Sequence, residues 1–218
     1  MDRDTFLSAV TSAVGRDRVP SAPDSDPGPL VPDLPPVDVV TLFSEILERV
    51  DGHVHTGDPM HAIDEIVARY GKGRFLSWDT DHLPVPGAVA HLEGLGCTRA
   101  DAEVPGDPDA RRSHQTGYMD IHIGLTGATA GFAETGSIVV RSGQGKPRMA
   151  SLVPLIHIAL LPTDQVFRSP MHWLTDPETE IANDANVVYI TGPSRTADIE
   201  QQLNLGVHGP RELHVILV

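Results

Sequence analysis

Two glycine-rich turns hold the residues whose types and spacing best fit chemistry. The first, GLTGATAGFAETGS, runs from Gly124 to Ser137, and Glu134 is its only acidic residue. Glycine lets a backbone approach a ligand closely, and a carboxylate among small residues can act as a base or nucleophile. Glu134 is therefore a candidate catalytic residue. A tight turn that carries a surface acid is the alternative interpretation.

The second turn, GPSRT, spans Gly192 to Thr196 and precedes residues 196–205, which we predict to form a helix. The free N–H groups and the positive dipole end at the start of a helix attract anions. The hydroxyls of Ser194 and Thr196 and the guanidinium of Arg195 could complete a site for a phosphate or carboxylate. These three residues and Gly192 are therefore candidate ligand-binding residues.

A structural role for the second turn is the alternative. Pro193 has no N–H group, and Asp198 and Glu200 would already complement the helix dipole. A hydroxyl would then cap the helix, and Arg195 would pair with Asp198. His208, in the turn GVHGP that follows, could face the same cleft and carry a proton near neutral pH. His208 is the second catalytic candidate.

The chain has eleven histidines and one cysteine. His53 and His55 would share one face of a strand and could bind a metal together with His61. No carboxylate or thiol spacing completes a known motif there, so we predict no metal site. The single cysteine excludes an internal disulfide and any iron–sulfur cluster held by several thiolates of this chain alone. Three residues are expected in the core, namely Cys97, His122 and His157.

Hydrophobic periodicity indicates the elements that must position these turns. Apolar residues three and four apart predict helices, and continuous apolar runs predict buried strands. The predicted helices cover residues 2–14, 37–50, 59–71, 87–96 and 196–205. The predicted strands lie within residues 52–57, 74–78, 118–127, 137–140, 153–162, 186–192 and 212–218. This alternation argues for an α/β fold with a mainly parallel sheet.

The segment from NVVYITG to ELHVILV predicts one βαβ unit of about thirty residues, with the helix at 196–205 between its strands. The GPSRT loop would then follow the carboxyl end of a parallel strand. Open α/β sheets bind their ligands at that end. The pattern therefore predicts a ligand cleft at this loop.

Composition limits the function classes. The net charge is −14, with 16 basic and 30 acidic residues, which disfavours nucleic acids and anionic membranes as partners. The longest apolar stretch, LIHIALL, is too short to span a bilayer, and the N-terminus lacks signal-peptide features, so we expect a cytoplasmic protein. Residues 1–36 are expected to form a helix and a proline-rich surface arm, or a strap that docks on a partner subunit, and residues 37–218 a single domain.

Three stretches resemble the LUD-domain family, and more narrowly its lactate utilization protein C subfamily. They are GFAETGSIVV, SLVPLIHIALLP and YITGPSRTADIEQQLNLGVHGPRELHVILV, and the most specific parts are GPSRTADIE and GVHGPRELHVIL. The resemblance extends over residues 38–218. It departs at QQLNLG, where a more apolar run is expected.

This resemblance implies a three-layer α/β/α sandwich similar to the NagB/RpiA/CoA-transferase superfamily. It also implies an accessory role beside two iron–sulfur partner proteins that oxidise L-lactate to pyruvate. The clusters would then reside in the partners, and this chain alone would bind no cofactor. It would bind a small anionic ligand or dock its partners. The family supplies no agreed catalytic residue, so activity of the isolated chain stays open.

Analogies within the superfamily keep other functions open. Some CoA-transferases use a glutamate nucleophile in a short turn similar to Ala133–Gly136, which adds Thr135 and Gly136 to the candidate ligand-binding residues. Phosphosugar isomerases of this fold bind phosphate through turns that TGPSRT resembles. A free-standing enzyme on a phosphorylated or CoA-linked substrate, with Glu134 as nucleophile or base, is one alternative. A non-catalytic scaffold is another.

Overall fold

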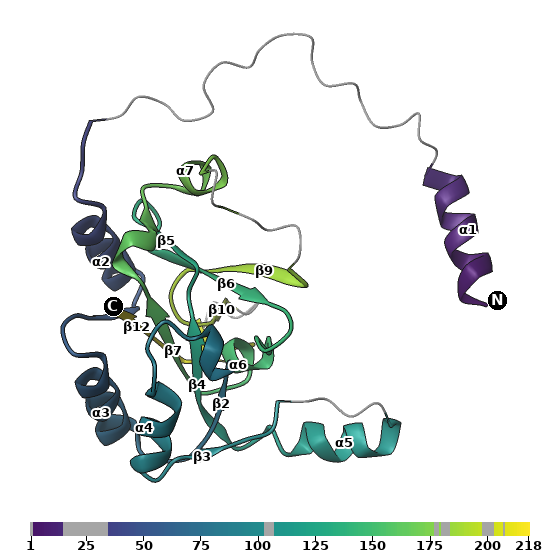
Figure 1. Cartoon of the computed structure of the whole chain (residues 1–218), viewed down its shortest axis with the longest axis horizontal. Helices are drawn as coiled ribbons and strands as arrows, with labels where there is room; N and C mark the ends of the chain where they lie inside the picture. Colours follow the sequence, from purple (N-terminus) through teal and green to yellow (C-terminus); the bar gives the residue numbers. More distant parts are fainter. Residues whose placement is uncertain are drawn as a thin grey trace. The chain divides into compact units, whose positions relative to one another are not determined.

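Figure 1 shows the chain as a computed structural model, which describes residues 2–14, 35–102, 107–176, 179, 184–197, 203–206 and 208–218. The chain divides into two compact units, Met1–Pro32 and Asp33–Val218. Helix α1 (Arg3–Val14) belongs to the first unit and confirms the predicted helix. Most of the predicted proline-rich arm lies outside the described residues. Within those residues, no helix is long and apolar enough to cross a membrane.

The second unit contains the other helices. Asp38 caps the start of α2 by accepting hydrogen bonds from the N–H groups of Val40 and Thr41. Asp58 caps α3 in the same way, and Pro59 is its first residue. Three helices match predictions: α2 (Val39–Arg49), α3 (Pro59–Tyr70) and α4 (Ala88–Gly94). Three others were not predicted: α5 (Pro108–Thr116), α6 (Met149–Leu152) and α7 (Pro170–Leu174).

A six-stranded parallel sheet forms the centre of the second unit, in the order β1-β12-β7-β4-β2-β3. The longer strands are almost fully buried, as their continuous apolar runs predict. With its flanking helices, the sheet gives the predicted three-layer α/β sandwich (Figure 1). The strands are β1 (His53–His55), β2 (Arg74–Ser77), β3 (Thr98–Arg99), β4 (Ile121–Gly127), β7 (Ile156–Leu161) and β12 (Glu212–Leu217).

Side-chain alternation assigns the two faces of this sheet. Gly124 lies against α6, since a Cβ atom there would be 1.8 Å from the Ala150 carbonyl oxygen. Gly124 is in register with His157, and His157 with Leu213, so these residues share the α6 face. The next residue along β12, His214, therefore faces the opposite side, where α3 packs. The two faces thus carry different polar residues.

The last part of the chain differs from the predicted βαβ unit. Strand β9 (Asn186–Ile190) belongs to a separate four-stranded sheet, in the order β8-β5-β6-β9, and pairs antiparallel with β6 (Ser137–Ser142). The other members are β5 (Ala130–Phe132) and β8 (Val166–Phe167). The expectation that the strands at 137–140 and 186–192 are parallel is therefore wrong. Their β-branched residues favour any pleated sheet and do not select its direction.

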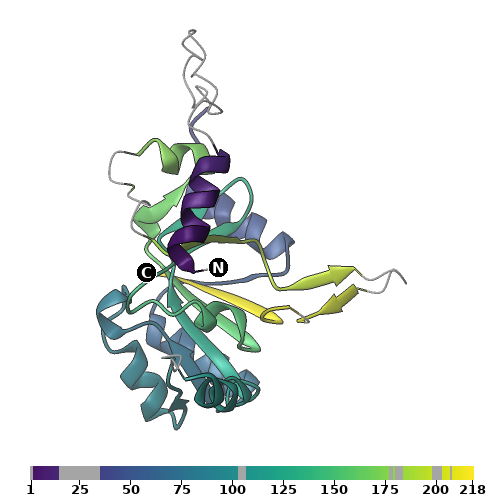
Figure 2. The same ribbon diagram turned by 90° about the vertical axis from the view of Figure 1, so that its right-hand side faces the viewer.

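The predicted helix at 196–205 is also wrong. Strands β10 (Arg195–Ala197) and β11 (Leu203–Leu205) pair antiparallel, and Figure 2 shows these yellow-green strands projecting from the rest of the unit. The Gly206 N–H donates to the Ser194 carbonyl oxygen at 2.9 Å, so both ends of the segment lie together. A helix of ten residues would separate its ends by about 15 Å. Residues 198–202 lie outside the described residues.

Candidate functional site

The carboxylate of Glu134 is paired in the structure. Arg168 donates from Nε to Glu134 Oε1 at 2.9 Å and from Nη1 to the Pro35 carbonyl oxygen at 2.6 Å. The Glu134 side chain is 42% exposed. This ion pair connects the turn to the segment that precedes α2. Its catalytic role stays a prediction.

Two of the predicted ligand-binding glycines lie against the carboxyl end of α2. Gly136 has φ 63°, and a Cβ atom there would lie 2.6 Å from the Leu47 backbone nitrogen. Gly192 has φ 75°, and its Cβ atom would lie 2.3 Å from the Val50 carbonyl oxygen. The backbone at these two glycines therefore lies close to α2 of the same chain, an approach that a side chain would prevent.

A chain of hydroxyl groups connects the two predicted turns. The Oγ1 atom of Thr135 lies 2.7 Å from Ser137 Oγ, which lies 2.6 Å from Thr191 Oγ1. The structure thus brings Thr135, Gly136 and Gly192 into one region, although 54 residues separate Ser137 from Thr191. Glu134 points to Arg168 instead.

Arg195 also has partners within the chain. Its guanidinium donates to the Val50 carbonyl oxygen at 2.7 Å and forms an ion pair with Asp51. Its expected partner, Asp198, lies outside the described residues. Thr196 is in β10, in register with Asn204, so neither residue begins a helix. A helix dipole therefore does not supply the anion site that the sequence predicted here.

Ser194 and His208 meet at a small cavity of about 220 Å³, which we call the Ser194 cavity. It lies at the amino-terminal ends of β7 and β12, on the α6 face of the sheet. The prediction that the GPSRT loop follows a parallel strand is therefore wrong, because the loop follows β9 of the antiparallel sheet. The lining includes three aliphatic hydroxyl side chains, one tyrosine and two histidines: Ser151, Thr191, Ser194, Tyr189, His157 and His208.

His157 is the most unusual residue of this lining. It is 1% exposed, and its Nε2 atom lies 2.8 Å from Thr126 Oγ1. Its Nδ1 atom is buried without a hydrogen-bond partner among the described residues, so the expectation of a satisfied ring holds for one nitrogen only. Burial lowers the pKa of His157 to about 4, which keeps the imidazole neutral at physiological pH.

Lowering the pH from 6.5 to 5 is expected to reduce the free energy of unfolding by about 2 kcal/mol through His157. The folded-state pKa is depressed, so the unfolded chain binds a proton in this interval and the folded chain does not. In urea titrations, His157→Gln should lower the average slope of stability against pH over this interval by about 1.1 kcal/mol per unit. The exposed His61→Gln variant is the control, and an unchanged slope for His157→Gln would contradict a buried neutral imidazole.

Two larger cavities lie at the carboxyl ends of the parallel strands, and the sequence analysis missed them. One, of about 650 Å³, is lined by segments that follow β2, β4 and β7, and includes Trp78 and His82. The other, of about 880 Å³, follows β2 and β3 and includes Asp79 and Arg99. Strand order reverses between β2 and β4, which is the position where open α/β sheets bind ligands. The polar run DTDH after the predicted strand at 74–78 was the available signal.

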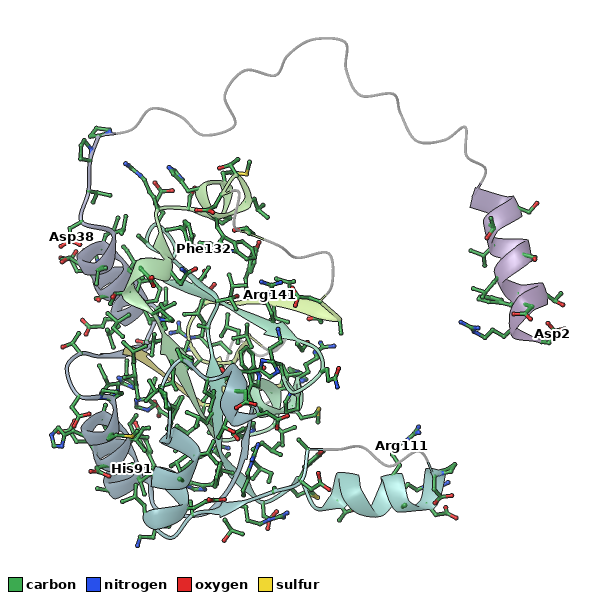
Figure 3. The ribbon with its side chains drawn as sticks, viewed as in Figure 1. Asp2, Asp38, His91, Arg111, Phe132 and Arg141 are labelled. Carbon is green, nitrogen blue, oxygen red and sulfur yellow. The ribbon has the colours of Figure 1, made fainter. Side chains whose placement is uncertain are left out.

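Charged pairs line these carboxyl-end cavities. Arg99 lies 3.3 Å from Asp79 and also donates to the Trp78 carbonyl oxygen at 3.2 Å. The indole Nε1 atom of Trp78 is buried and has no hydrogen-bond partner in the described part of the chain. Arg141, labelled in Figure 3, pairs with Asp184 of the segment before β9. These groups offer hydrogen-bond donors to a ligand larger than the Ser194 cavity admits.

The histidines of β1 form a third polar site. His53 and His55 share one face of β1, as predicted, while His61 lies apart and pairs with Glu65 at 3.5 Å. Glu212 and His214 of β12 complete the group on the α3 face. Glu212 and His214 were not predicted as members of this group, because each is 159 residues away in the chain from the histidine that it contacts.

Two relatives of known sequence span the whole chain, and a third spans about two thirds or more of it. A lactate utilization protein C of Shouchella clausii (strain KSM-K16) is 28% identical over 232 residues, spanning 100% of this chain and 97% of that protein. That of Bacillus subtilis (strain 168) is 26% identical over 236 residues, spanning 100% and 96%. That of Bacillus licheniformis is 32% identical over 168 residues, spanning 72% and 67%.

A solved structure shares the fold. A DUF162 family protein from Deinococcus radiodurans superposes with a TM-score of 0.54 at 19% identity, covering 85% of this chain and 99% of that chain. Residues 40–218 match the LUD domain family model. The match covers every strand of both large sheets, and the chain therefore belongs to the LUD-domain family.

Proposed function

We propose that this chain takes part in lactate utilization in the cytoplasm, as an accessory subunit beside iron–sulfur proteins that oxidise L-lactate to pyruvate. Full-length similarity to proteins named lactate utilization protein C supports the process. The only cysteine, Cys97, is buried at 5% exposure, so this chain cannot hold a cluster with its own thiolates alone. The electrons of the reaction would pass to clusters in the partners.

The ligand we propose is a small hydroxy or keto acid bound in the Ser194 cavity. The observation that supports it is the unpartnered Nδ1 atom of His157, a residue that lines this cavity. Buried polar atoms normally have partners, so a missing partner points to a ligand or water. A carboxylate can accept from the hydroxyls of Ser194 and Thr191, and a hydroxyl of the ligand can pair with His157. The volume of about 220 Å³ suits an acid of few atoms.

Thermal unfolding with L-lactate and with pyruvate tests this proposal. A ligand at about 100 times its Kd should stabilise the fold by about 2.7 kcal/mol, which raises the Tm by about 5–10 °C for a domain of this size. Ser194→Ala should lose most of this shift, whereas Ser8→Ala, an exposed serine of α1, should keep it.

Two outcomes would contradict the proposal. One is an equal shift in Ser194→Ala and the unmodified protein, which would place the ligand elsewhere. The other is steady oxidation of lactate by the purified chain, which would exclude an accessory role.

A second candidate function is that of an enzyme that binds a larger phosphorylated or CoA-linked substrate in the carboxyl-end cavities. The observation that favours it is the buried, unpartnered Nε1 atom of Trp78, which lines the cavity of about 650 Å³, while Arg99 lines the neighbouring cavity of about 880 Å³. A thermal shift with CoA esters or phosphosugars that disappears in Arg99→Ala would select this function. A shift only with lactate or pyruvate would select the first.

A further inference from the structure

Four polar side chains gather on the α3 face of the sheet, at its β1 edge. His53 Nε2 lies 3.0 Å from Glu212 Oε2, and His55 Nε2 lies 3.0 Å from His214 Nδ1. The rings of His53 and His214 are stacked, with centroids 4.7 Å apart. One donor atom each from His53, Glu212 and His214 lies within 4.8 Å of the others. This spacing brings three metal-ligating groups to one point.

The backbone fixes this arrangement. His53 and His214 are direct neighbours in the parallel pairing of β1 and β12. Glu212 is two residues before His214, so both side chains leave β12 on the same face. Ligands carried by neighbouring strands of a buried sheet are held more rigidly than ligands carried by loops. The backbone therefore holds the three side chains close together before any ion binds.

Hydrogen bonding within the group does not account for all of its polar atoms. His214 is 2% exposed, and its Nε2 atom has no hydrogen-bond partner among the described residues. The ring of Tyr70, on α3, meets that of His214 edge-on at 5.3 Å, and burial together with the nearby Glu212 carboxylate raises the pKa of the Tyr70 hydroxyl. Buried polar atoms without partners are rare, and a bound ion or water is a common reason. The His214 Nε2 atom is such an atom, and it belongs to the same group as the Glu212 carboxylate and the His53 imidazole.

We propose that His53, Glu212 and His214 bind a divalent transition-metal ion of the zinc class. Two imidazoles and one carboxylate form the ligand set of zinc sites that keep an open position. With metal–donor bonds of about 2.0–2.1 Å, tetrahedral donors lie about 3.3 Å apart. The 3.0 Å between His53 and Glu212 fits this spacing, and His214 reaches it by a small movement.

The neighbouring residues complete the site. If His214 donates from Nδ1 to His55, its Nε2 atom presents a lone pair to the ion, as ligating histidines commonly do. His55 is therefore a positioning residue. Tyr70 packs against His214 and interacts with Glu212, so we expect its hydroxyl to bond to a metal-bound water. The His53 and Glu212 side chains are 39% and 35% exposed, which gives the ion a path from solvent.

Titration calorimetry of the full, chelator-treated chain with Zn²⁺ tests the site. We expect one ion per chain, and a loss of affinity of about 100-fold or more in His53→Gln and in Glu212→Gln. His55→Gln should cost about tenfold through its effect on His214. His61→Gln is the matched control and should bind as the unmodified chain does, because His61 pairs with Glu65 outside the group. Visible absorption bands of bound Co²⁺ should disappear in the same variants.

Both ligand variants change partly exposed side chains, and circular dichroism checks that they fold. Absence of saturable Zn²⁺ binding at micromolar concentration would overturn the proposal. Equal binding in His53→Gln, Glu212→Gln and the unmodified chain would also overturn it, since the ion would then lie elsewhere. Neither result depends on lactate, so this test and that of the proposed function can fail separately.

Discussion

Gly136→Ala is expected to lower the free energy of unfolding by about 3–5 kcal/mol. Gly136 has φ 63°, a region that costs an L-residue about 1–3 kcal/mol. An added Cβ atom would also lie 2.6 Å from the Leu47 nitrogen and 2.7 Å from its Cα atom. Both are backbone atoms of α2, so no side-chain rotation relieves the overlap. Urea unfolding of the purified variant measures the change.

The matched control is Gly94→Ala at the end of α4, where nothing lies within 4 Å of the added atom. It should leave stability unchanged or raise it by up to about 1 kcal/mol. Comparison of the two variants also separates a structural role of Gly136 from a ligand-binding role. A Gly136→Ala variant of normal stability that no longer responds to lactate would favour the ligand-binding role predicted from the sequence.

Phe132→Ala is expected to lower the free energy of unfolding by about 3–5 kcal/mol. Phe132, labelled in Figure 3, is fully buried in a small apolar cluster with Trp173, apart from the main core. Its ring lies 5.9 Å from that of Trp173 and meets that of Tyr189 edge-on at 5.3 Å. Its removal leaves a cavity that two bulky rings cannot fill without moving.

Phe132→Leu should cost less, since it keeps most of the buried volume. Met119→Ala, at a side chain 88% exposed, should stay within about 0.5 kcal/mol of the unmodified protein. A cost below about 1 kcal/mol for Phe132→Ala would mean that the four-stranded sheet is held by other contacts.

The parallel sheet was predictable because local sequence patterns mark its strands. The runs that form β4, β7 and β12 are continuous and apolar, and α3 begins at Pro59 and ends before Gly71. Such signals depend only on neighbours in the chain. The fold class and most helices of residues 39–94 followed from them.

The antiparallel pair of β10 and β11 was not predictable from local sequence patterns. The segment from Arg195 to Leu205 shows no strict alternation, and its shape depends on the bond between Gly206 and Ser194 and on the pairing of Arg195 with Asp51. Asp51 is 144 residues away in the chain. Local propensity is overridden where distant contacts fix both ends of a segment.

In the candidate sites, too, local features were predictable and contacts between distant residues were not. Gly136 and Gly192 were predicted to bind a ligand, and in the structure both lie against the backbone of α2, a contact that the sequence could not show. His53 and His55 were recognised as sharing a face, whereas Glu212 and His214 joined them only through the order of strands in the sheet. The sequence shows the types of these residues, but which of them lie together depends on the order of strands in the sheet.

The order of strands also has a consequence for how the protein is made. β1 pairs with β12, and 159 residues separate His53 from Glu212. At a synthesis rate of about 5–20 residues per second, β1 exists for about 8–30 s before its neighbour does. During that time its edge is open to other chains, and a short strand with charged or polar side chains resists such pairing. The sequence His-Val-His at this edge is short and polar, so His53, which is proposed to bind a metal in the finished protein, and His55 would also hinder pairing of the nascent strand with other chains.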